Sequence, residues 1–139
     1  MTKTIEIKSK GFSLTLSFLS RSAGGTYDDW LHCAVEAHTS GFSANYTFKM
    51  LTDELIRFHE KLKAIQKSVG KEAIAELTDR SGPDEYFNLS LKFNKLGHIE
   101  GHVMLNNVQS KVSLETEFAT DQTVLEQLID QINAALPIQ

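Results

Sequence analysis

The stretch that most constrains the fold of this chain is residues 42–66, where the spacing of apolar residues changes from that of a strand to that of a helix. From Phe42 to Met50, apolar residues occupy every second position, as in a strand with one buried face. After Thr52 they recur every three or four residues, the period of an amphipathic helix. Thr52 is placed to cap this helix, and two acidic residues follow it where free N–H groups favour negative charge. We therefore predict a strand that turns directly into a helix.

The same pattern returns near the C-terminus. Apolar residues alternate over residues 112–118, the pair Thr120-Asp121 is placed to cap a helix, and an apolar stripe follows from Leu125 to Leu136. Two strand-to-helix units of this kind predict a sheet with two helices packed against one of its faces.

Further strands are predicted by alternating apolar residues over 4–8, 12–18, 30–39, 72–77, 86–93 and 97–105. Residues 20–29 have the composition of a loop. Most connections are short, which favours antiparallel neighbours. We expect a single α+β domain over residues 1–139, with a largely antiparallel sheet of about seven or eight strands in the order ββββαββββα and two helices on one face. A duplication of the two halves, and a continuous sheet through both, stay open.

The composition limits the classes of partner. The net charge is −4 and the 14 Lys and Arg residues are scattered, which argues against nucleic acid as the main partner. An acidic surface instead favours water or a basic partner. Cys33 is the only cysteine, so no intramolecular disulfide forms and a zinc site with several thiolates is excluded. Neither a secretion signal nor an apolar stretch long enough to span a bilayer is present. We expect a cytoplasmic protein without a cofactor or a membrane partner.

The sharpest spacing of polar residues is His98, Glu100 and His102, which share one face of a predicted strand. Two imidazoles and a carboxylate suit a divalent metal when they converge. Same-face neighbours on a strand stand roughly 7 Å apart and point in parallel, however, so they would need a bulge to share one ion. The competing interpretation is the solvated face of an antiparallel sheet.

A second set, His32, Glu36 and His38, repeats this alternation beside Trp30. If both strands face the same way, these residues form an acid–base pocket, a plain polar face, or a protein-binding patch with aromatic anchors. The candidates for partner binding, together with the loop at 20–29, are Trp30, His32, Glu36, Tyr86, His98, Glu100 and His102.

Other reactive side chains have simpler interpretations. Cys33 falls on the apolar side of its strand and is expected to be a small buried hydrophobe. His59 is expected at the edge or solvent side of the first helix. The sequence contains no nucleophile elbow, phosphate-binding loop or dinucleotide-binding turn. We therefore expect no catalytic residues and no metal ligands.

A longer ordered series of residues points to a family. Its members are Trp30, Gly41-Phe42-Ser43, Phe48, Asp53-Glu54-Leu55, Phe58, Leu62, Leu89, Leu91, Gly97-His98-Ile99, Phe118, Thr120-Asp121-Gln122-Thr123 and Leu125. Over about residues 28–136, this series resembles the WapI-type immunity proteins of bacteria. The resemblance implies a non-enzymatic protein that binds and neutralises a cognate polymorphic toxin, often a nuclease domain, inside the producing cell.

Two alternatives stay open beside the resemblance. One is a small metal-dependent or acid–base enzyme that uses His98, Glu100 and His102. The other is a structural subunit of a larger assembly, with an open sheet face or edge as its contact.

Overall fold

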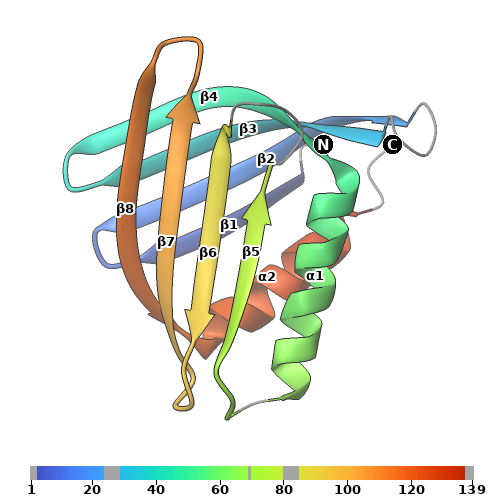
Figure 1. The fold of residues 1–139 in the computed structure, drawn as a ribbon, viewed down its shortest axis with the longest axis vertical. Helices are drawn as coiled ribbons and strands as arrows, with labels where there is room; N and C mark the ends of the chain where they lie inside the picture. Colours follow the sequence, from blue (N-terminus) through green and yellow to red (C-terminus); the bar gives the residue numbers. More distant parts are fainter. Residues whose placement is uncertain (1–2, 24–28, 69, 80–84, 137–139) are drawn as a thin grey trace.

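The structure is a computed structural model, and it describes residues 3–23, 29–68, 70–79 and 85–136. Within these ranges the elements follow one another in the order ββββαββββα (Figure 1), which confirms the predicted α+β fold class. The first half comprises β1 (Lys3–Ser9), β2 (Phe12–Ala23), β3 (Asp29–Thr39), β4 (Phe42–Leu51) and α1 (Thr52–Lys67). The second half comprises β5 (Ala73–Thr78), β6 (Phe87–Phe93), β7 (His98–Asn107), β8 (Val112–Asp121) and α2 (Gln122–Ala135).

The described strands form two antiparallel sheets of four strands each. Sheet A has the order β1-β2-β3-β4 and sheet B the order β5-β6-β7-β8, so within each sheet the strands pair in the order of the sequence. In Figure 1 the strands of sheet B cross those of sheet A at a steep angle. The two halves of the chain therefore do not join into one continuous sheet, a point that the sequence left open.

Aromatic side chains join the inner faces of the two sheets. Phe12 of β2 stacks on Phe118 of β8 with ring centroids 4.3 Å apart, and Phe48 of β4 stacks on Phe87 of β6 at 5.4 Å. All four rings are buried, and such stacked pairs add to the free energy of apolar burial. The inward-facing alternate positions of both sheets thus build one shared core.

The two helices complete this core by packing on the inner side of the sheets. Helix α1 contacts β5 and α2, whereas α2 contacts α1 and β1. In Figure 1, α1 runs alongside β5 and α2 passes behind sheet B. The front face of sheet B is left uncovered by both described helices.

The two predicted helix caps have different outcomes. Asp121 caps α2, because its carboxylate accepts the Thr123 N–H at 3.0 Å. The prediction for Thr52 is wrong: Leu51 occupies the capping position without a side-chain hydrogen bond, and Thr52 is already helical. The Thr52 hydroxyl instead donates to Asp29 at 2.7 Å, which ties the start of α1 to β3.

His59 also differs from the prediction. Only 4% of its surface is exposed, because α2 packs against α1 and widens the buried arc of α1 beyond one apolar stripe. Burial, followed by the nearby Lys63, lowers the pKa of His59, and its Nε2 has no hydrogen-bond partner among the described residues. Helical periodicity could not reveal this burial, since it gives no information on the second helix.

Candidate functional site

The candidate residues divide between the outer faces of the two sheets. On β3, Trp30, His32 and Glu36 alternate with buried residues and face outward from sheet A. On β7, the second histidine–glutamate set does the same on sheet B, with His98 and Glu100 exposed and His102 half-buried. Because the sheets pack through their inner faces, the two sets do not gather on one sheet face.

The remaining candidate, Tyr86, lies just before β6 at the junction of the sheets. It is half-buried, and its backbone is fully engaged: its N–H donates to the Asp79 carboxylate and its carbonyl accepts the Tyr46 hydroxyl. Tyr46 comes from β4 in sheet A, and its hydroxyl oxygen also accepts the Asn106 N–H of β7 at 3.1 Å. One phenol group thus links sheet A to two segments of sheet B.

We expect the substitution Tyr46→Phe to lower the free energy of unfolding by about 1 kcal/mol, the usual net value of such hydrogen bonds. The loss should be moderate because the Asn106 N–H also donates to the Tyr86 carbonyl. Denaturant unfolding measures it, with Tyr86→Phe as the matched control, since the described hydrogen bonds of Tyr86 come from its backbone. Equal stability of the two variants would contradict the linking role of Tyr46.

The described part of the predicted loop at residues 20–29 is strand in the structure. β2 continues to Ala23 after a bulge between Phe18 and Ser20, and β3 begins at Asp29. The Arg21 guanidinium binds the Asp29 carboxylate through two hydrogen bonds of 2.8 and 2.6 Å, and this lowers the pKa of Asp29. The strand extension was missed because serines interrupt its apolar alternation; residues 24–28 lie outside the described part of the chain.

The outer face of sheet A is polar with little net charge. Glu36 pairs with His38 at 3.2 Å, and Glu6 pairs with Lys8 at 3.2 Å. Between these pairs the outward positions carry hydroxyl and amide side chains: Ser13, Thr15, Ser17, Ser43, Asn45 and Thr47. Trp30 and His32 line a small hollow of about 130 Å³ with Lys49.

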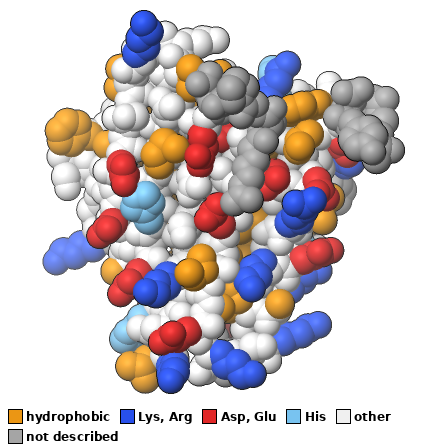
Figure 2. Space-filling view, in the orientation of Figure 1, with side chains coloured by type: hydrophobic (Ala, Val, Ile, Leu, Met, Phe, Trp, Pro, Cys, Tyr) orange, Lys and Arg blue, Asp and Glu red, His pale blue; other side chains and the backbone are white. Residues whose placement is uncertain are grey.

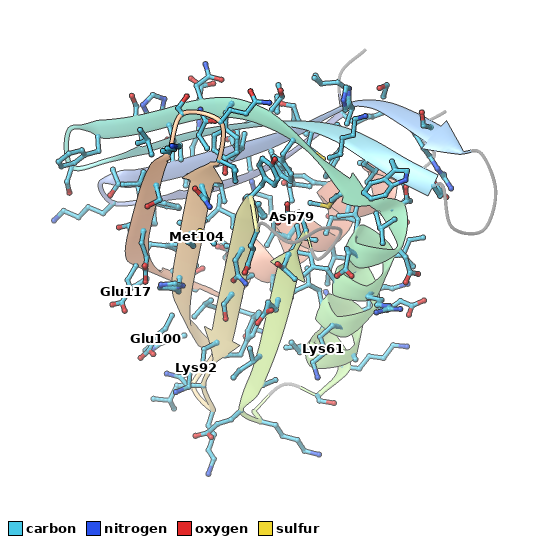
Figure 3. All side chains as sticks on the ribbon, turned by 45° about the horizontal axis from the view of Figure 1, so that its top comes forward. Lys61, Asp79, Lys92, Glu100, Met104 and Glu117 are labelled. Carbon is cyan, nitrogen blue, oxygen red and sulfur yellow. The ribbon has the colours of Figure 1, made fainter. Side chains whose placement is uncertain are left out.

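The outer face of sheet B is more acidic. Its outward residues on β6, β7 and β8 are Asn88, Ser90, Lys92, His98, Glu100, His102, Met104, Asn106, Ser113, Glu115, Glu117, Ala119 and Asp121. Lys92 is the only Lys or Arg among them. Figure 2 shows red carboxylate groups spread over this front face, and Figure 3 shows Lys92, Glu100 and Glu117 projecting from the sheet.

A shallow hollow of about 540 Å³ lies on this face. Small side chains at Ser90 and Ala119 leave space, and Lys92, Glu100 and Glu117 stand around it. Beside it, His102 Nε2 lies 2.7 Å from a carboxylate oxygen of Glu115. Glu115 and Glu117 were not among the sequence candidates, although they occupy the positions between the alternating apolar residues of the last predicted strand.

The candidate acid–base side chains do not converge on a common point. Within the described residues, no group of three His, Cys, Asp or Glu side chains is placed to hold one metal ion. His102 instead pairs with Glu115 on the neighbouring strand. Cys33 is fully buried and its pKa is raised by that burial, which disfavours the nucleophilic thiolate. Both outer faces present exposed polar and charged side chains.

Comparison with known proteins decides the family. The model of the WapI-like immunity protein family matches residues 4–138, nearly the whole chain. The chain belongs to the WapI-like immunity protein family. The family match covers the series of residues on which the resemblance was based, and it extends toward both ends. No curated protein matches the sequence of this WapI-like chain at a significant level.

Three plant proteins of known structure share this fold. WHY1 from Arabidopsis thaliana has a TM-score of 0.56 at 13% identity, covering 99% of this chain and 90% of that one. The plant transcriptional regulator PBF-2 gives 0.55 at 13% identity, covering 99% and 82%. WHY3 from Arabidopsis thaliana gives 0.51 at 15% identity, covering 97% and 86%. At such identities the similarity concerns the fold alone.

No helix in the described part of the WapI-like chain is long and apolar enough to cross a membrane.

Proposed function

We propose that this WapI-like chain is a non-catalytic immunity protein that binds and neutralises a cognate protein toxin by direct contact. The observation that carries the proposal is the family match over residues 4–138. The whole chain would act as one binding domain, because Tyr46 and the stacked phenylalanines tie the two sheets into one core. Neutralisation then depends on the surface of the folded chain and needs no cofactor.

Two structural features support a binding role. The outward positions of both sheets present polar and charged groups on rigid strands, which fix their positions before a partner arrives. The hollows on these faces are shallow, and the one free thiol is buried. We place the protein in the cytoplasm of the producing cell, where a buried, unpaired thiol persists in its reduced form.

Survival of cells tests the proposal. The chain should be co-expressed with the toxin domain encoded beside its gene, and an unrelated toxin domain serves as the control. We expect growth to be restored only with the neighbouring toxin, and the two proteins to purify together. Cell death despite normal amounts of folded protein would contradict the proposed function.

A further inference from the structure

We propose that the outer face of sheet B is the toxin-binding surface, and that it receives a basic protein surface with a Lys or Arg side chain in the hollow between Glu100 and Glu117. The inference rests on the proposed function, because it names the surface and the chemistry of the partner. It commits to one of the two open faces, whereas the sequence candidates were spread over both.

The strand register places Glu100 and Glu117 beside a hollow that can hold a Lys or Arg side chain of the partner. Glu100 lies opposite Ala119 on one side and Lys92 on the other, and the next outward row holds Glu117, His102 and Ser90. Glu100 and Glu117 are thus diagonal neighbours on adjacent strands, within the reach of one guanidinium group. Ala119 and Ser90 are short, which leaves the hollow of about 540 Å³ between the longer side chains.

Apolar groups lie at the border of this hollow. Ile74 of β5 lines it and is 55% exposed, and Met104 is half-buried in the outward row beyond His102. The aliphatic stem of a partner Lys or Arg can pack on such groups while its charged end meets the carboxylates. The face therefore combines apolar contact with opposite charge, as expected for a protein contact.

The outer face of sheet B differs in charge from the outer face of sheet A. On β7 and β8 the outward carboxylates are Glu100, Glu115, Glu117 and Asp121, and no Lys or Arg faces outward from these two strands. On sheet A, Glu6 and Glu36 are paired locally with Lys8 and His38. The side chain of Glu115 is 67% exposed even in its contact with His102. A basic partner is therefore attracted to sheet B and only weakly to sheet A.

The test is the affinity of the purified chain for the purified toxin domain encoded beside its gene, measured by calorimetry. The variant Glu100→Lys/Glu117→Lys should bind about 100-fold more weakly, because like charges would then meet at the contact. Glu36→Lys is the control: it changes an exposed glutamate on an inner strand of sheet A, and affinity should stay within about threefold. Raising the salt from about 50 to about 500 mM should weaken wild-type binding more than binding by the double variant.

A second variant distinguishes the loss of negative charge from misfolding as the cause of weaker binding. Glu100→Gln/Glu117→Gln keeps the size of both side chains and should bind about 10-fold more weakly, with an unchanged unfolding transition. Unchanged affinity of both double variants, or an equal loss with Glu36→Lys, would overturn the assignment to sheet B while leaving toxin binding intact. If the wild-type chain does not bind the toxin domain at all, the proposed function itself fails.

Discussion

Replacing Gly101 with alanine is expected to lower the free energy of unfolding by about 3 kcal/mol, because the new methyl group would overpack the core. A Cβ atom at this position would lie 2.1 Å from Cζ of Phe118 and 2.4 Å from each Cε. Phe118 is the direct partner of Gly101 in the β7–β8 register, and its ring covers the glycine. The same ring stacks on Phe12 of sheet A, so its displacement would also disturb the contact between the sheets.

A double-mutant cycle isolates this effect. Denaturant unfolding would compare Gly101→Ala in the wild-type chain and in a Phe118→Ala background, where the obstructing ring is absent. We expect the cost of the Gly101 substitution to fall below about 1 kcal/mol in that background, since an added methyl group then meets open space. A similar cost in both backgrounds would show that Phe118 is not the reason for the glycine.

The second large effect is expected at Asp79, whose substitution by alanine should cost about 2–4 kcal/mol through unsatisfied buried hydrogen bonds. Asp79 is 1% exposed, and Figure 3 shows it in the interior, away from the outward groups of sheet B. Its carboxylate accepts the Tyr86 N–H at 2.9 and 3.0 Å and the Phe87 N–H at 2.9 Å. Asp79→Ala would leave both donors without a partner at the start of β6.

The same carboxylate makes stability depend on pH. Burial raises the pKa of Asp79 to about 6, against the Phe87 and Tyr86 N–H groups, which lower it. The folded chain thus holds this proton more tightly than the unfolded chain, whose carboxyl has the ordinary pKa of 3.8. The raised pKa contributes up to roughly 3 kcal/mol to the free energy of unfolding. This contribution is fully present below pH 3.8 and is lost as the pH rises through about 6.

Asp79→Asn tests this dependence, because it keeps an oxygen acceptor but carries no ionisable proton. Unfolding free energies at about pH 4 and about pH 7.5 should show that the variant gains stability relative to the wild type as the pH rises. A constant difference between the two proteins at both pH values would mean that Asp79 does not titrate with a raised pKa.

The strands and helices could be predicted from local periodicity, because alternation and helical spacing depend on neighbours in the chain. Residues 42–66 contain both patterns, and β4 and α1 follow them closely. The separation into two sheets was not predictable in this way. Alternation identifies a buried face but not the strand that pairs beside it. Only the structure shows that the strands before and after α1 belong to different sheets.

The candidate site was predictable only in part. The sequence placed His98 and Glu100 on an outward face, and both are exposed in the structure. It did not indicate that Glu117 lies diagonally across the register from Glu100, since that proximity depends on the β7–β8 pairing. Nor did it show that the backbone of Tyr86 is held by Tyr46 and Asp79, which are distant in sequence. Contacts between sheets and between helices carry no local signal.

The most direct test of toxin neutralisation is inhibition of the purified toxin domain encoded beside the gene by the purified chain. Titration should abolish the activity of the toxin domain at a fixed stoichiometric ratio, and the Glu100→Lys/Glu117→Lys variant should need a large excess to do the same. Full toxin activity in the presence of excess folded wild-type chain would contradict the assignment of this protein as a toxin-binding immunity protein.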